Sequence, residues 1–115
     1  MSKLSTHVLD TRHGKPADGV RTRLHRLESG EMKLTVSGQT DADGRITLLE
    51  GDLFVAGLYE LSFEVADYFR AQGVFLPEPP FFGSIVIRFG IADPQRNYHV
   101  PLLVTPWSYS TYRGS

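Results

Sequence analysis

The chain has 115 residues, of which 41% are hydrophobic and 22% charged, the proportions of a globular protein, and its length predicts one domain over residues 1–115. Its 12 Lys and Arg against 13 Asp and Glu give a net charge of −1, without the positive excess that nucleic-acid binders use to displace counterions from phosphates. The sequence has no cysteine, which excludes disulfides and thiolate sites. It has no apolar run near the roughly 20 residues that span a bilayer, so no membrane partner is expected. We therefore expect a soluble, cytoplasmic protein.

Short segments with alternating apolar and polar residues predict β-strands in the first part of the chain. The run LSTHVLD, residues 4–10, is the first of them. Residues 20–27 and 32–37 both alternate, and the turn residues Glu28-Ser29-Gly30 between them predict a hairpin. A further strand is expected to begin at Arg45, directly after the Asp43-Gly44 turn.

The second part of the chain contains the clearest strand, residues 59–65, in which large apolar residues alternate with Glu and Ser. Residues 66–72 followed by Gly73 predict a short helix with a glycine past its end. The prolines of PEPPFF predict a stiff extended connection. The runs IVIRF, YHVPLLV and SYSTY predict three more strands, and regularly spaced short strands are typical of an all-β sandwich.

The four histidines are the natural candidates for acid and base chemistry, because an imidazole titrates near neutral pH. His13 lies in a loop rich in Gly and Pro, and His25 lies among arginines on the side of a strand that we expect to face solvent. His7 and His99 each lie inside a predicted strand, where the ring needs a hydrogen-bond partner or faces a cavity. Either a structural or a functional role remains open for these two, since sequence separation does not tell whether they meet.

Two arginines could cooperate with these histidines. Arg45 is expected at the rim of a strand and Arg113 in the C-terminal tail, and guanidinium groups pair with planar carbonyl edges in a bidentate manner. From the residues alone, a solvated role is the favoured interpretation for both arginines. No serine-hydrolase, zinc-protease or phosphate-loop motif is present, and no two histidines have the close spacing typical of a metal site, so neither metal nor cofactor is expected.

The two ends of the chain resemble a known family. LSTHVLDTRHGKPADGV and YHVPLLVTPWSYSTYRGS are similar to the two signatures of the transthyretin-like 5-hydroxyisourate hydrolases, with TYRGS as the diagnostic ending. The resemblance covers essentially the whole chain. It implies a transthyretin-like β-sandwich of seven to eight strands in two sheets with one short helix. It also implies a homotetramer, a dimer of dimers, whose edge strands pair between subunits.

The resemblance also implies an activity, the hydrolysis of 5-hydroxyisourate to 2-oxo-4-hydroxy-4-carboxy-5-ureidoimidazoline in purine degradation. The catalytic residues that it implies are His7, Arg45 and His99. The substrate-binding residues that it implies are Tyr112, Arg113, Gly114 and Ser115. On this hypothesis the tail is an ordered pocket wall, whereas a domain terminus with nothing to hold it is usually frayed.

Two departures from the family pattern affect loops rather than these positions. Gly83-Ser84 stands where relatives commonly have Pro-Glu, and Ser108 stands where glycine is frequent. Two other functions remain possible from the sequence. A transthyretin-like carrier would bind a small planar ligand without consuming it, and an immunoglobulin-like adhesion module would be a monomer with a dispensable tail.

Overall fold

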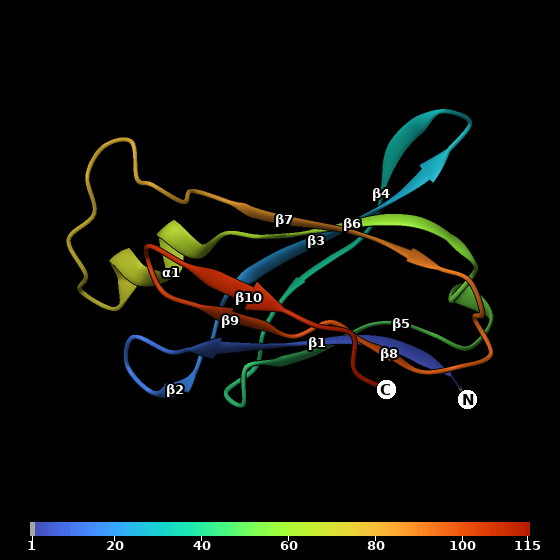
Figure 1. Cartoon of the computed structure of the whole chain (residues 1–115), viewed down its shortest axis with the longest axis horizontal. Helices are drawn as coiled ribbons and strands as arrows, with labels where there is room; N and C mark the ends of the chain where they lie inside the picture. The colour runs from blue at the N-terminus through green and yellow to red at the C-terminus, as the bar shows by residue number, and fades with distance from the viewer. Residues whose placement is uncertain (1) are drawn as a thin grey trace.

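The computed structural model describes residues 2–115 and folds them into two β-sheets packed face to face, with one α-helix at an end of the sandwich (Figure 1). The elements in chain order are β1 (Lys3–Asp10), β2 (Lys15–Pro16), β3 (Arg21–Glu28), β4 (Glu31–Gln39), β5 (Arg45–Glu50), the 3₁₀ turn η1 (Gly51–Leu53), β6 (Gly57–Phe63), α1 (Val65–Ala71), β7 (Ile85–Ile91), β8 (Tyr98–His99), β9 (Leu102–Val104) and β10 (Tyr109–Thr111). Strands β2 and β8 have two residues each, which leaves eight strands of three or more. The predicted all-β sandwich with one short helix is confirmed.

One sheet has the strand order β4-β3-β6-β7. Its β3–β4 hairpin turns at Ser29 and Gly30, whose φ angles of 51° and 82° are both positive, as a two-residue turn that matches the twist of a hairpin requires. The central strand β6 directs Tyr59, Leu61 and Phe63 inward, and all three are fully buried. The predicted hairpin is therefore confirmed. The clearest predicted strand is present as β6, but it begins and ends two residues earlier than residues 59–65, since Val65 already belongs to α1.

The other sheet is built around β1. Strand β1 pairs antiparallel with β5 and β2 and parallel with β8 and β9, and β10 continues the sheet beyond β9. Residues 98–104 were expected as one strand, but the structure divides them into β8 and β9 at Val100-Pro101. Proline has no N–H to donate to a neighbouring strand, which explains why the ladder is interrupted there.

Helix α1 begins and ends one residue earlier than residues 66–72, the predicted range. Tyr68 and Phe69 are buried on its inner side, and Gly73 follows the helix with a φ of 83°, as expected for a glycine past a helix C-terminus. The helix lies at the end of the sandwich near the long loop that leads to β7 (Figure 1). Among residues 2–115 no helix is long and apolar enough to cross a membrane.

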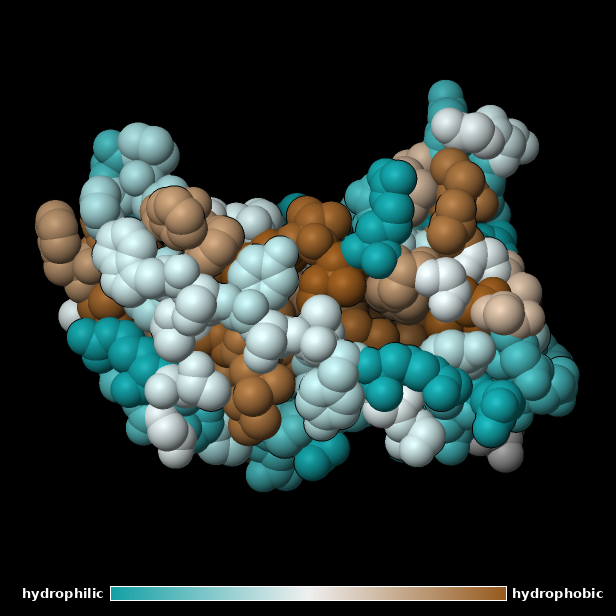
Figure 2. All heavy atoms as spheres, viewed as in Figure 1, coloured by the Kyte–Doolittle hydropathy of each residue, from teal (hydrophilic) through white to brown (hydrophobic). Residues whose placement is uncertain are grey.

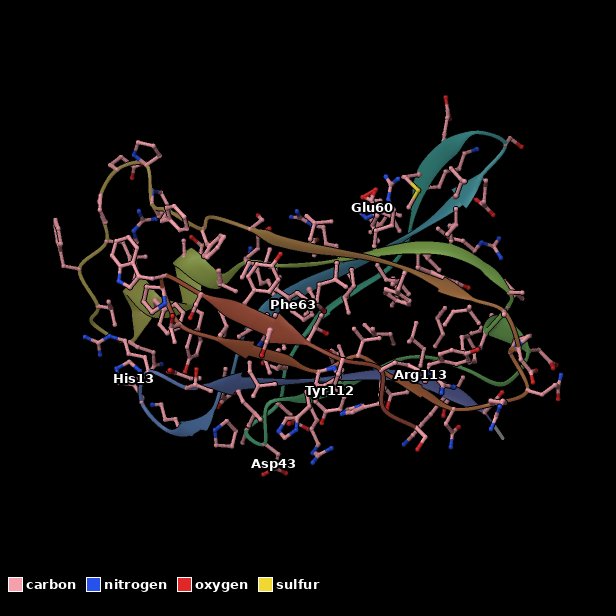
Figure 3. All side chains as sticks on the ribbon, viewed as in Figure 1. His13, Asp43, Glu60, Phe63, Tyr112 and Arg113 are labelled. Carbon is pink, nitrogen blue, oxygen red and sulfur yellow. The ribbon has the colours of Figure 1, made fainter. Side chains whose placement is uncertain are left out.

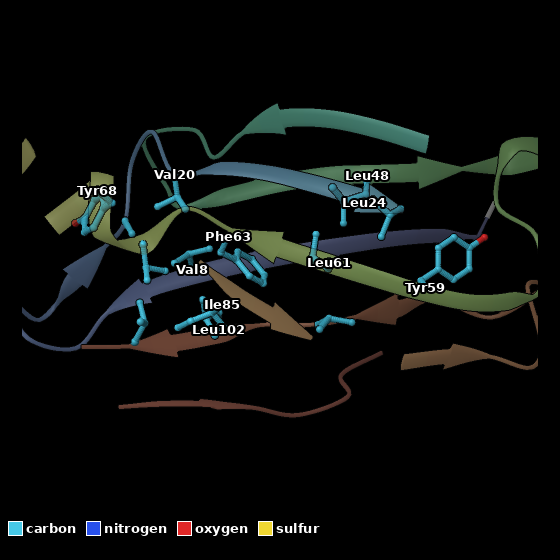
Figure 4. Packing of buried hydrophobic residues seen from close by; sticks show 14 of the residues in the cluster. Val8, Val20, Leu24, Leu48, Tyr59, Leu61, Phe63, Tyr68, Ile85 and Leu102 are labelled. Carbon is cyan, nitrogen blue, oxygen red and sulfur yellow. The ribbon is translucent and has the colours of Figure 1, made fainter. Parts of the chain in front are cut away.

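The core fills the space between the two sheets (Figure 4). Leu24, Leu61 and Phe63 from one sheet meet Leu4 and Leu102 from the other, and all five are 0% exposed. Burial of each such side chain contributes about 1.5–3 kcal/mol to folding. Because Leu4 and Leu102 belong to β1 and β9, the core holds the sheet that carries the candidate site in a fixed position.

The two loop departures noted in the sequence are accommodated locally. The Ser84 hydroxyl donates a hydrogen bond to the Glu64 carboxylate over 2.8 Å, and the Gly83 carbonyl accepts one from the first turn of α1. The backbone N–H of Ser108 donates to the Thr105 hydroxyl over 3.0 Å and closes the turn between β9 and β10. These loop residues therefore form hydrogen bonds that hold their own turns.

Candidate active site

The outer face of β1 carries the first candidate residue. Side chains alternate along a strand, and Leu4, Thr6 and Val8 are fully buried on the inner face of β1. Ser5 and His7 therefore point outward from the sandwich, where both are half-buried. The alternation alone places the imidazole of His7 on the outside of the sheet and away from the core.

Arg45 lies beside His7. The two residues are direct partners in the antiparallel pairing of β1 with β5. The turn before β5 is held by Asp41, whose carboxylate accepts a hydrogen bond from the Arg45 backbone N–H over 3.0 Å. Within this turn Gly44 has a φ of 76°, and a Cβ there would lie 2.5 Å from the carbonyl oxygen of Val8, so only glycine fits. The turn thus fixes where β5 starts and places Arg45 beside His7.

His99 reaches the same face from the other side of β1. The parallel pairing of β8 with β1 sets His99 beside Ser5, and the His99 Nδ1 and Ser5 Oγ atoms are 2.8 Å apart. The centroids of the His7 and His99 rings are 6.4 Å apart, with an angle of 40° between the ring planes. The Nε2 atom of His7 is buried and, within residues 2–115, has no hydrogen-bond partner. A buried polar atom of this kind is suited to bind a water or a ligand atom.

The surroundings of His99 disfavour its charged form. Burial is the largest of the causes that lower the pKa of His99 below 6.5, the ordinary value for histidine. The nearby positive charges of Arg45, His7 and Lys3 lower this pKa further. A histidine with a pKa below 6.5 is mostly neutral at pH 7 and can accept a proton.

The C-terminal tail is paired with β8. The Gly114 N–H donates to the His99 carbonyl over 2.7 Å, and the His99 N–H donates to the Gly114 carbonyl over 3.1 Å. A Cβ at position 114 would lie 3.2 Å from the Cβ and 3.4 Å from the Cδ2 of His99, a tight approach. The tail is therefore ordered against the histidine rather than frayed, and Ser115, next to Gly114, is exposed.

The side chains of Tyr112 and Arg113 lie elsewhere. The Arg113 guanidinium carbon is 4.3 Å from the centre of the Tyr98 ring, a cation–π contact, and Tyr112 is 61% exposed. Both line a groove of about 410 Å³ between β7 and the tail, which includes Ile87 and Phe89 but neither imidazole. Figure 2 shows the apolar floor of this hollow, and Figure 3 shows both residues on the tail below it. The structure therefore brings His7, Arg45, His99 and the Gly114 backbone together, but leaves these two side chains on a different surface.

Comparison with known proteins places the chain in a family. The model of the HIUase/Transthyretin family matches residues 4–114. The chain belongs to this family. It is 50% identical over 117 residues to the 5-hydroxyisourate hydrolase of Pseudomonas aeruginosa, with 100% of this chain and 93% of that protein covered.

Two solved structures of the HIUase/Transthyretin family illustrate its range. The structure of Klebsiella pneumoniae 5-hydroxyisourate hydrolase matches with a TM-score of 0.82 and 36% identity, covering 100% of both chains. Sea bream transthyretin in complex with thyroxine matches with a TM-score of 0.88 and 30% identity, covering 97% of this chain and 94% of that one. The transthyretin-like sandwich inferred from the sequence is thereby confirmed, and the chain is similar both to a 5-hydroxyisourate hydrolase and to a transthyretin that binds thyroxine.

The structure also contains a buried polar cluster that sequence reasoning missed. Asp10 is 0% exposed and accepts hydrogen bonds from the His13 ring over 2.6 Å and from the Tyr68 hydroxyl over 2.8 Å. Burial by itself would raise the pKa of Asp10, but the hydrogen bonds from His13 and Tyr68 outweigh it and lower this pKa below 3.8. The sequence did contain a signal, because Asp10 continues the buried alternation of β1. His25, by contrast, is half-buried on the other sheet opposite Glu60.

Metal binding was not expected from the sequence. In the part of the chain that the structure describes, no group of three or more His, Cys, Asp or Glu side chains is arranged to hold a metal ion. The absence of a metal requirement stays a prediction, which activity after chelation would test.

Proposed function

We propose that this protein is a 5-hydroxyisourate hydrolase, which opens the six-membered ring of its substrate to give 2-oxo-4-hydroxy-4-carboxy-5-ureidoimidazoline in urate degradation. The observation that carries the proposal is the meeting of His7, Arg45 and His99 on one face beside the C-terminal tail. The 50% identity to a 5-hydroxyisourate hydrolase against 30% to a transthyretin supports the enzyme over the carrier.

In this proposal His99 is the base. Water is a poor nucleophile, and a neutral imidazole that removes its proton as the new bond forms contributes about 10²–10⁴-fold to the rate. The low pKa of His99 supports a neutral ring at pH 7. Two imidazoles held close also resist becoming charged together. His7, with its partnerless buried Nε2, is assigned to orient the water or the substrate.

Arg45 is assigned to the substrate's carbonyl groups. A guanidinium offers two parallel N–H donors to carbonyl oxygens, and no carboxylate among residues 2–115 forms an ion pair with Arg45. During the attack, the water oxygen bonds to the carbonyl carbon and negative charge develops on the carbonyl oxygen. Stabilisation of such an oxyanion by one donor is worth about 10²–10³-fold in rate. The ring C–N bond then breaks, and the nitrogen takes the proton that His99 accepted.

The tail is assigned to substrate binding. We attribute positioning of the substrate ring and of the attacking water to Tyr112, Arg113, Gly114 and Ser115. The backbone pairing of Gly114 with His99 supports this assignment, because it keeps the last residues beside the proposed base. The side chains of Tyr112 and Arg113 face the neighbouring groove in the single chain, so their contact with substrate depends on the assembly of subunits.

The proposed assembly is a homotetramer, a dimer of dimers, in which residues 1–115 form one hydrolase domain per subunit. Strands β7 and β10 are sheet edges on the same side of the sandwich (Figure 1), and open edges are usually covered. Phe81 and Trp107 nearby are 67% and 59% exposed, which favours burial by a second copy. A second contact across the His7 face would enclose the site. The cysteine-free composition is compatible with a cytoplasmic location.

The test of this function follows the ultraviolet absorbance of freshly generated 5-hydroxyisourate with and without the protein. We expect a decay that is faster than in buffer, proportional to protein concentration and unaffected by EDTA. Decay at the buffer rate would contradict the hydrolase, and saturable binding without consumption would then support a carrier. Sedimentation velocity tests the assembly, for which a species of four chains is expected and a monomer would contradict it.

A further inference from the structure

Ser5 contacts the proposed base directly, although neither the sequence motifs nor the proposed mechanism gives it a role. Its Oγ atom is 2.8 Å from Nδ1 of His99. The backbone holds this contact, because Ser5 and His99 are partners in the parallel pairing of β1 with β8 and the Val100 N–H donates to the Ser5 carbonyl over 2.9 Å. On its other side, His99 packs against the Gly114 backbone. The ring is therefore fixed from two directions.

The contact decides which ring nitrogen of His99 can react. A neutral imidazole has one N–H and one lone pair, and the partner of one nitrogen sets the state of the other. A serine hydroxyl can either donate to Nδ1 or accept from it. If Ser5 donates, Nε2 carries the proton and cannot act as a base. If Ser5 accepts, Nε2 has the lone pair and can take a proton from water.

The charges around His99 favour the second arrangement. The charged groups that act on it are Lys3 and His7 of β1 and Arg45 of β5, and all of them disfavour added positive charge. Since Nδ1 already contacts Ser5, Nε2 is the ring nitrogen that is free to interact with these positive charges. A lone pair is attracted by a nearby guanidinium, whereas an N–H dipole directed toward it is repelled. Ser5 is half-buried, so its own hydroxyl proton can reach solvent.

We propose that Ser5 is a positioning residue, whose hydroxyl accepts a hydrogen bond from Nδ1–H of His99 and holds the tautomer with a free Nε2 lone pair. The role in catalysis rests on the proposed hydrolase function. When His99 takes the proton from water, the Nδ1–H to Oγ bond becomes a charge-assisted bond, which is about twice as strong as a neutral one. Ser5 therefore stabilises the protonated ring as well as the starting tautomer.

A direct test reads the tautomer without any reaction. Long-range ¹H–¹⁵N correlation spectra of the histidine rings distinguish Nδ1–H from Nε2–H imidazole. At a pH above the His99 transition we expect Nδ1–H in the wild-type protein and in Ser5→Thr, and a shift toward Nε2–H in Ser5→Ala. An Nε2–H ring in the wild type, or an unchanged tautomer in Ser5→Ala, would overturn the proposal.

Kinetics test the consequence for catalysis. For Ser5→Ala we expect a kcat about tenfold lower with little change in KM, since part of the 10²–10⁴-fold contribution of the base is lost, and Ser5→Thr should restore most of the rate. Ser62→Ala, on the other sheet, is the matched control. A wild-type-like kcat in Ser5→Ala of an active enzyme would refute the positioning role. A tautomer shift in a protein that fails to hydrolyse 5-hydroxyisourate would refute the proposed function but support the Ser5–His99 assignment.

Discussion

His7 and His99 lie 6.4 Å apart between ring centroids, although 92 positions separate them in the chain. They meet because β1, which carries His7, pairs with β8, which carries His99. On its other side β1 pairs with β5. The same arrangement adds Arg45 to the pair. A base, a second imidazole and a cation are thus assembled on a rigid sheet, which limits how far any of them can move during a reaction.

Arg45→Ala tests the assigned stabilisation of the oxyanion. We expect kcat/KM for 5-hydroxyisourate to fall by about 10²–10³-fold, because a donor aimed at the developing charge is removed. Arg70→Ala is the control, since Arg70 is an exposed arginine of helix α1 that pairs with Glu78, and it should retain nearly full activity. Equal losses in the two variants would show that net charge, not position, controls the rate.

The pH dependence of kcat tests His99 as the base. Its folded pKa lies below 6.5, so the neutral ring, and with it the activity, should persist below pH 6.5 and disappear as the pH falls through that lowered pKa. Lys3→Gln removes one of the positive charges that lower this pKa, and its acid limb should therefore move to higher pH. An acid limb above pH 6.5 in the wild type, or a shift to lower pH in Lys3→Gln, would argue against this base.

Gly114→Ala tests whether the tail positions His99. The added Cβ would lie 3.2 Å from the Cβ of His99, so the ring or the tail must shift by a few tenths of an ångström, a fraction of the roughly 1 Å misplacement that costs about 10²-fold. We expect a loss of kcat of about tenfold or more in stopped-flow assays. Gly83→Ala is the control, because a Cβ there meets nothing within 4 Å. Full activity in Gly114→Ala would show that the tail does not position His99.

The alternation of residues was enough to predict most strands and the two faces of β6. It could not predict the division of residues 98–104, because residues 100–104 are continuously apolar and the effect of Pro101 depends on which neighbouring strand would accept a hydrogen bond from the N–H that proline lacks. The alternation also misplaced the start of the helix by one residue. Val65 is apolar and in step with β6, yet it is the first residue of α1.

The candidate site depended on pairings that no local pattern contains. Local patterns were reason enough to consider His7 and His99 one at a time, but only the parallel pairing of β1 with β8 places Ser5 against the His99 ring. The family resemblance supplied the residues without their geometry. It grouped Tyr112 and Arg113 with the histidines, whereas in the single chain their side chains follow the groove beside β7.

The last prediction concerns the buried Asp10 cluster, which joins the end of β1 to helix α1. Tyr68→Phe removes a hydrogen bond to a buried carboxylate and should lower the free energy of unfolding by about 1–3 kcal/mol, measured by urea denaturation at a fixed protein concentration.

The stability that Asp10 adds should depend on pH. Because the pKa of Asp10 is lower in the folded state than 3.8, its contribution to the free energy of unfolding is complete above pH 3.8 and is lost as the pH falls through the folded value. Asp10→Asn should therefore destabilise the protein at pH 7 and flatten this acid dependence. The exposed Asp52 provides the control, since Asp52→Asn should leave both the stability and its pH profile unchanged. Equal effects of the two Asn variants would show that the cluster adds no specific stability.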